Sequence, residues 1–207
     1  MGTPAVLVIA SGNAGKVREF GALLADLGLQ TQPQPAGLEV DETGTTFAAN
    51  ARLKAQAVAL ATGQWALADD SGLSVDALGG APGVHSARYA DSDAARIARL
   101  LRELAAAGAH SPSARGARFT AALALANPNG ELVLEVEGHC PGQILEAPRG
   151  EGGFGYDPVF FVPELGLSFA EMDKATKASI GHRGRAFALL EPRLRQLLVE
   201  LTDSAVE

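Results

Sequence analysis

Three segments of the sequence carry residues that could bind a polyphosphate or a metal ion. The first is Ser11-Gly12-Asn13-Ala14-Gly15-Lys16, which lies between an apolar run and a helical pattern. A helix N-terminus offers N–H groups and a partial positive charge to a phosphate, and Lys16 adds a full charge. The run is not a Walker loop, because Ala10 stands where the first glycine belongs and Val17 replaces the Ser or Thr. An ordinary strand–turn–helix junction with a surface lysine is the alternative.

The second segment is acidic and contains Asp69 and Asp70, at the end of a short apolar strand. Glu42 lies farther back, just before an expected helix. Mg²⁺ prefers one or two carboxylates together with phosphate oxygens. Adjacent strand residues point to opposite faces, so Asp69 and Asp70 share a site only if the strand has already turned, which Gly72 permits. A turn stabilised by side-chain-to-backbone hydrogen bonds is the alternative.

The third source of charge is basic. Lys54 lies four residues after Asn50, hence on the same helix face, where it could reach a phosphate or be solvated. A second basic group near the C-terminus could bind phosphates, and its His and Arg could donate to a purine 6-oxo group. A charged helix surface is the alternative. This group consists of Lys174, Lys177, His182, Arg183 and Arg185.

Helices and strands must position these segments. The apolar run 5–10 predicts a buried strand, and an apolar stripe predicts a helix over 13–27, capped by Asn13 and ended by Gly28. A second helix is expected over 46–61 and a short strand over 65–68, followed by a loop at 79–83. A third helix starts after Asp91 or Ser92 and ends before Gly108.

The second half of the chain predicts a hairpin. Its strands are 118–126 and 131–137, joined by Asn127-Pro128-Asn129-Gly130. The segment 109–116 is expected to be an exposed connection, 159–162 a strand, and the end a helical tail that Pro192 kinks or restarts. Because a hairpin lies among strands and helices, we expect one α/β domain over residues 1–207, with flanking helices around a mixed sheet.

One motif misleads. Gly150, Gly152 and Gly155 satisfy the dinucleotide fingerprint G-x-G-x-x-G. That fingerprint needs a strand before it and a helix after it, whereas Tyr156-Asp157-Pro158 and a strand follow here. We therefore reject a dinucleotide site.

Composition restricts the possible functions. The 207 residues are 47% hydrophobic and 20% charged, with a formal net charge of −7. No basic face for nucleic acid is evident, and no apolar run could span a bilayer. Cys140 is the single cysteine, which favours a reducing compartment, and no signal peptide is visible. We expect a cytoplasmic protein.

Taken together, the motifs resemble the inosine triphosphate pyrophosphatase family, which removes deaminated purine nucleotides. The resemblance spans nearly the whole chain and depends on eight motifs in order. They are Ser-Gly-Asn-x-x-Lys at 11–16, Glu-Thr-Gly at 42–44, Phe-x-x-Asn-Ala-x-x-Lys-Ala at 47–55, Ala-Asp-Asp-Ser-Gly-Leu at 68–73, Gly-Gly-Ala-Pro-Gly at 79–83, Ser-Ala-Arg-Tyr at 86–89, Gly-Gly-Phe-Gly-Tyr-Asp-Pro at 152–158 and His-Arg-Gly at 182–184.

The resemblance implies an elongated, two-lobed fold with a substrate cleft between the lobes, and a homodimer. It implies hydrolysis of ITP, dITP and XTP to the monophosphate and pyrophosphate, with Mg²⁺ held by Glu42 and Asp70. Asp70 is similar to the family's proton acceptor. A carboxylate that binds a metal is a poor base, so Glu42 or Asp69 could share this work, and Lys54 is expected to assist. The implied substrate contacts are residues 11–16, Ser71, Phe154, Gly155, Tyr156, Asp157, Lys177, His182 and Arg183, with Phe154 stacking on the base.

The sequence departs from the family's usual residues at two positions, and two rival functions stay open. Gly181 stands where the family usually has Ser, so a hydroxyl contact is missing or met by water, and Ser11 replaces a commoner Thr. One rival is a Maf-type pyrophosphatase of modified pyrimidine or 7-methylguanine triphosphates. The other is a nucleotide sensor without catalysis, which intact Glu42, Asp69, Asp70 and Lys54 argue against.

Overall fold

The computed structural model describes residues 6–203, and within them the strands form one seven-stranded sheet. The strand order is β2-β1-β3-β4-β5-β6-β7. Pairing is parallel between β1 (Val6–Ile9) and both β2 (Gln30–Pro33) and β3 (Trp65–Val75). It is antiparallel between β6 (Phe160–Val162) and both β5 (Leu132–Ile144) and β7 (Leu167–Ser168). The prediction of a mixed α/β sheet is confirmed. Ala5, where the first strand was expected to begin, lies outside the described residues.

The chain divides into two compact units. Unit 1 consists of residues 1–70, 122–137 and 186–207, and unit 2 of residues 71–121 and 138–185. Long strands belong to both units, because β3, β4 (Gly116–Ala126) and β5 each pass from one to the other.

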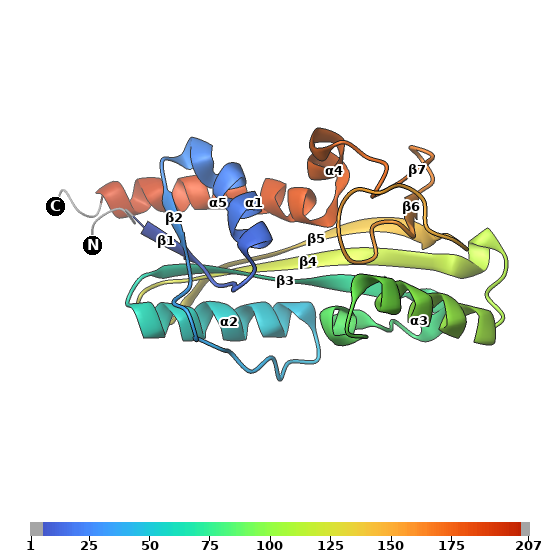
Figure 1. Ribbon diagram of the computed structural model, residues 1–207. Helices are drawn as coiled ribbons and strands as arrows, with labels where there is room; N and C mark the ends of the chain where they lie inside the picture. The colour runs from blue at the N-terminus through green and yellow to red at the C-terminus, as the bar shows by residue number, and fades with distance from the viewer. Residues whose placement is uncertain (1–5, 204–207) are drawn as a thin grey trace. The chain divides into compact units, whose positions relative to one another are not determined.

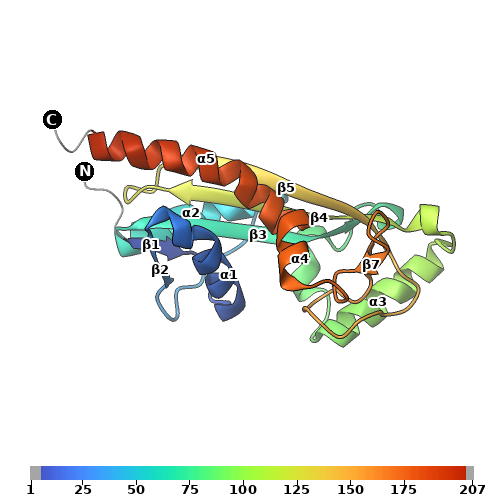
Figure 2. The same ribbon diagram turned by 90° about the horizontal axis from the view of Figure 1, so that it is seen from above.

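In unit 1, helices cover both faces of the sheet. Helix α1 (Ala14–Leu24) lies on one face and α2 (Phe47–Thr62) on the other (Figures 1 and 2). Small side chains allow α2 to approach the strands closely, since its Ala51 and Ala55 are fully buried with Ala66 and Ala68 of β3. The first two helices lie where the sequence predicts them, but α1 ends at Leu24 rather than at Leu27. Asn13 and Thr46 cap them, and Gly28, after the short η1 (Ala25–Leu27), and Gly63 take left-handed backbone angles.

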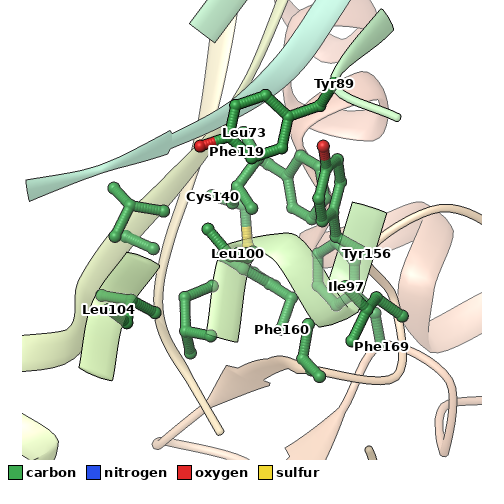
Figure 3. Close-up of a cluster of buried hydrophobic side chains, with 14 of the residues drawn as sticks. Leu73, Tyr89, Ile97, Leu100, Leu104, Phe119, Cys140, Tyr156, Phe160 and Phe169 are labelled. Carbon is green, nitrogen blue, oxygen red and sulfur yellow. The ribbon is translucent and has the colours of Figure 1, made fainter. Parts of the chain in front are cut away.

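Unit 2 has its own aromatic core. Three leucine or isoleucine side chains of α3 (Asp93–Ala106) converge with Cys140 and the ring of Phe119 (Figure 3). Phe119 packs edge-on against Phe160 at 4.6 Å between ring centroids and stacks on Phe169 at 5.6 Å. Ser92 rather than Asp91 caps α3. The remaining helices are η2 (Asp76–Leu78), η3 (Gly83–Arg88), η4 (Pro112–Arg115), α4 (Lys174–Ile180) and α5 (His182–Asp203), the last of which continues into unit 1.

Several predicted boundaries were wrong. The strand expected to stop at Ala68 continues to Val75, so Asp-Asp-Ser-Gly is extended strand and not a turn. The second hairpin strand likewise continues beyond Glu137 to Ile144. Residues 109–116 are not wholly exposed, because Ala109 and Arg115 are buried around η4. Pro192 lies inside α5 and does not start a helix.

No helix within residues 6–203 combines the length and apolar character needed to cross a membrane.

Candidate functional site

The carboxylates of Asp69 and Asp70 meet lysines from two different helices. Asp70 follows Ala68 by two residues and therefore faces α2, where its Oδ1 lies 2.8 Å from Lys54 Nζ. Asp69 faces α1, and its Oδ2 lies 2.7 Å from Lys16 Nζ. Because β3 does not turn, the two carboxylates do not share one side of the strand.

Lys54 gathers the acidic residues on the α2 side. Its ammonium group donates to Glu42 Oε1 at 2.9 Å, to Asp70 Oδ1 at 2.8 Å and to the Asp69 carbonyl at 3.0 Å. An ammonium group has three donors, so these partners use all of them. Two carboxylates around one cation leave a net negative charge, which suits a further cation. We call Glu42, Lys54 and Asp70 the acidic cluster.

Electrostatics in the acidic cluster favour uptake of a proton or a cation. Burial raises the pKa of Asp70, the charge of Lys54 opposes that rise, and the charge of Glu42 adds to it, so the pKa is raised overall. Burial lowers the pKa of Lys54, but Asp70 and Glu42 outweigh that effect and raise it overall. A simple ion pair would depress the carboxylate's pKa. Here desolvation and the second carboxylate outweigh the pairing.

A buried asparagine fixes the segment that carries Glu42. Asn50 of α2 is fully buried, and its Oδ1 accepts the Gly44 N–H at 2.8 Å. A Cβ on Gly44 would lie 2.6 Å from that oxygen and 2.7 Å from the Ala49 Cβ, so only glycine fits there. The sequence showed that Asn50 shares a helix face with Lys54, but it gave no sign of the contact with Gly44.

The turn at residues 11–16 is already well hydrogen-bonded. Asn13 Oδ1 accepts the N–H groups of Gly15 at 2.8 Å and Lys16 at 3.3 Å, and Ser11 Oγ accepts the Asn13 N–H at 3.1 Å. These N–H groups are therefore less available to an anion than the sequence suggested. The ammonium group of Lys16 and the hydroxyl of Ser11 are the stronger candidates for contact with a phosphate.

A second group of predicted residues surrounds Phe154 in unit 2. Phe154 is 55% exposed, which is unusual for so large an apolar ring. Lys177 Nζ lies 5.3 Å from its ring centroid and Arg183 Cζ lies 5.7 Å from it. Arg183 also donates to Ser71 Oγ at 2.9 Å. An exposed ring beside two cations is a suitable platform for an aromatic, negatively charged ligand.

Three other predicted contact residues have structural roles here. Tyr156 is buried, and its hydroxyl donates to the Ser86 carbonyl at 2.9 Å. Asp157 is buried, accepts the Phe154 N–H at 2.9 Å and pairs with Lys177. His182 stacks on Phe119 at 4.8 Å between centroids, so only the edge of its ring is open to hydrogen bonding.

Comparison with known proteins identifies the family. The model of the Ham1 family matches residues 7–193. The chain belongs to the Ham1 family. It is 63% identical, over 95% of its length and 93% of the relative's, to the dITP/XTP pyrophosphatase of Synechococcus sp. strain CC9311. It is 62% identical, over 93% of its length and 96% of the relative's, to the dITP/XTP pyrophosphatase of Parasynechococcus marenigrum strain WH8102.

Ham1 structures share the fold. The HAM1 protein from Coxiella burnetii has a TM-score of 0.84 and 42% sequence identity, and the match covers 94% of this chain and 98% of that one. The resemblance read from the eight sequence motifs is therefore confirmed at the level of both family and fold.

Proposed function

We propose that this Ham1 protein hydrolyses the deaminated purine triphosphates ITP, dITP and XTP to the monophosphate and pyrophosphate. Relatives that are 62–63% identical bear the name dITP/XTP pyrophosphatase. The structural observation that carries the proposal is the acidic cluster, in which Lys54 holds Glu42 and Asp70 within 2.9 Å. The rival Maf-type and sensor functions are not favoured.

The acidic cluster fits a divalent cation. Within residues 6–203 no three His, Cys, Asp or Glu side chains form a metal group, so the protein alone offers an incomplete coordination shell. Asp70 Oδ2 is nevertheless buried and has no hydrogen-bond partner among those residues. Mg²⁺ commonly binds through one or two carboxylates and completes its shell with substrate phosphates and water. We assign Mg²⁺ to Glu42 and Asp70; when bound, it would neutralise charge on the phosphates.

The proposed reaction is the attack of water on the α-phosphorus. A water oxygen forms the new P–O bond, the bond to the β-phosphate oxygen breaks, and pyrophosphate leaves with its electron pair. Asp70 accepts the proton of the water. Lys54 and Lys16 stabilise charge on the phosphate oxygens. Asp69 keeps Lys16 extended, and we assign it this positioning role rather than proton transfer.

Base recognition is assigned to unit 2. Phe154 offers a stacking surface, and Lys177 and Arg183 supply positive charge beside it. Hypoxanthine and xanthine carry an acceptor at position 6, whereas adenine carries donors. A donor from His182 or Arg183 would be left unpaired by adenine, which costs about 1–3 kcal/mol. The cleft, the homodimer and the cytoplasmic location stay predictions.

The decisive experiment is pyrophosphate release in Mg²⁺ from ITP, dITP, XTP, ATP, GTP and modified pyrimidine triphosphates. Release from the first three with little from ATP and GTP supports the proposal. Release from modified pyrimidines alone would support the Maf-type activity. Tight ITP binding without release from any substrate would support the sensor.

A further inference from the structure

The segment that carries Phe154 is held by two carboxylates. Phe154 N–H donates to Asp157 Oδ2 at 2.9 Å, and Gly155 N–H donates to Asp93 Oδ2 at 2.7 Å. These two N–H groups belong to the peptide planes on either side of the Phe154 Cα. Fixing both planes fixes the backbone angles of Phe154, and hence the direction in which its ring leaves the chain.

The need for these contacts follows from the neighbouring glycines. Gly153 and Gly155 both have positive φ angles, 76° and 62°, so Phe154 stands between two residues with unusually free backbones. Its ring is 55% exposed and gains little from burial. Besides the two carboxylates, the cations of Lys177 and Arg183 lie beside the ring, at 5.3 Å and 5.7 Å from its centroid. Asp157 belongs to the family motif at 152–158, whereas Asp93 lies 62 residues before Gly155 in the sequence.

Asp93 is itself held in place. Its Oδ1 lies 2.6 Å from Arg96 Nη1, one turn along α3, and Arg96 Nε donates to the Ala90 carbonyl at 3.0 Å. Each carboxylate oxygen of Asp93 therefore has a separate partner, one on α3 and one in the Phe154 segment. Asp157 also pairs with a cation, but its Oδ2 alone serves both the Phe154 N–H and Lys177. Each side of Phe154 is thus fixed by a carboxylate that pairs with a basic residue.

We propose that Asp93 is a positioning residue for base recognition, which holds Phe154 in the orientation that stacks on the purine. This inference rests on the proposed function, because it assumes that Phe154 contacts the base. Asp93 does not touch the substrate. Its effect is transmitted by the Gly155 N–H.

The test is a double-mutant cycle between Asp93→Ala and Phe154→Ala, read as kcat and KM for ITP. Loss of one hydrogen bond to a charged acceptor should raise KM about five- to tenfold. We expect kcat within about twofold of wild type, since the acidic cluster is unchanged. In the Phe154→Ala background, Asp93→Ala should have almost no further effect. Asp93→Asn keeps an acceptor for the Gly155 N–H and should retain most of the affinity.

Asp91→Ala is the matched control, because Asp91 is an exposed carboxylate just before the same helix. Equal KM increases from Asp93→Ala in both backgrounds, or an unchanged KM in the wild-type background, would overturn the inference. The Kd for ITP, measured by calorimetry on the same four proteins, separates this result from failure of the proposed function. If ITP binds without hydrolysis, the cycle is read from Kd. If ITP does not bind to the wild type at all, both proposals fail.

Discussion

Asp69 and Asp70 are consecutive residues of β3, and their carboxylates pair with lysines on opposite faces of that strand. Lys16 of α1 lies 2.7 Å from Asp69, and Lys54 of α2 lies 2.8 Å from Asp70. The family motif Ala-Asp-Asp-Ser-Gly-Leu therefore combines two separate sites. One acidic residue completes the acidic cluster with Glu42, and the other holds the lysine of the 11–16 turn.

The two aspartates should respond differently to the same substitution. Asp70→Asn keeps an acceptor for Lys54 but loses the proton acceptor, and kcat should fall about 10²–10⁴-fold. Asp69→Asn weakens the hold on Lys16 and should mainly raise KM, by about tenfold, with kcat less affected. Steady-state kinetics on both variants checks this, with thermal unfolding as the control for folding. Equal loss of kcat in both would show that Asp69 also takes part in the chemical step.

The pH dependence of activity follows from the raised pKa of Asp70, which burial and the charge of Glu42 produce. Activity needs the ionised carboxylate, so at low Mg²⁺ the acidic limb should lie above the ordinary Asp value of about 3.9. Saturating Mg²⁺ favours the ionised form and should shift that limb to lower pH. A pH–rate profile of kcat/KM at two metal concentrations measures the shift. An acidic limb that does not move with Mg²⁺ would argue against Asp70 as a ligand.

The raised pKa of Asp70 also affects the stability of the folded state. A carboxylate with a raised pKa in the folded state stabilises the fold below its unfolded pKa, and that stabilisation is lost as pH rises through the folded pKa. At neutral pH the ionised Asp70 therefore costs stability. Asp70→Asn should have a melting temperature at least equal to that of wild type at pH 7, measured by thermal unfolding without Mg²⁺. A clear decrease would mean that the ion pair with Lys54 outweighs the cost of burial.

Gly181, which the resemblance marks as a departure from the family, has a steric role in the structure. A Cβ at this position would lie 2.5 Å from the Lys177 carbonyl, whose oxygen accepts the Gly181 N–H. Gly181→Ser should therefore displace the last turn of α4, move Lys177 and raise the KM for ITP several-fold. Gly181→Ala separates the clash from any benefit of a hydroxyl. Ser179→Ala, an exposed position on the same helix, is the control. A lower KM in the Ser variant would show that the missing hydroxyl matters more.

The sequence predicted elements that depend on local patterns and missed those that depend on pairing. Apolar stripes, start signals and stop signals located α1, α2 and α3, because helix formation is read from neighbouring residues. Strand β2, Gln-Thr-Gln-Pro, has no apolar pattern and exists because it pairs with β1. Strand β3 was shortened because Ser71 and Gly72 look like a turn, whereas pairing within the sheet keeps them extended.

The residues of the candidate site divide in the same way, into those that local motifs predict and those that only packing brings together. The roles proposed for Lys54 and Asp70 follow from residue types and motifs that the sequence already shows. Asp93 and Gly155 are far apart in the sequence, and neither residue type marks their contact. The sequence indicates only that Asn50 shares a helix face with Lys54. Contacts of this kind arise from the packing of distant segments, which a single sequence does not encode locally.

Asn50 offers a test of how the acidic cluster is assembled. Asn50→Ala removes the acceptor of the Gly44 N–H and leaves a buried gap, which should cost about 1–3 kcal/mol of unfolding free energy. The Glu42 segment should lose its fixed position, so the Mg²⁺ concentration for half-maximal activity should rise. Asn50→Asp keeps the acceptor and should preserve the position of Gly44. Denaturant unfolding and Mg²⁺ titration measure the two effects. A destabilised variant with unchanged Mg²⁺ dependence would separate Asn50 from the metal site.

Arg115 tests a purely structural interaction. It is buried, and its guanidinium donates to three backbone carbonyls: Nε to Ile144 at 2.6 Å, Nη1 to Ala109 at 2.8 Å and Nη2 to Leu145 at 2.8 Å. These bonds join Arg115, just before β4, to the end of β5 and to the segment that follows α3. Lysine cannot reproduce the planar fork, so Arg115→Lys should lower the unfolding free energy by about 2–4 kcal/mol. The kcat for ITP, measured well below the melting temperature, should be unchanged. Exposed Arg102→Lys on α3 is the control, and equal stability of the two variants would show that the three carbonyl contacts contribute little.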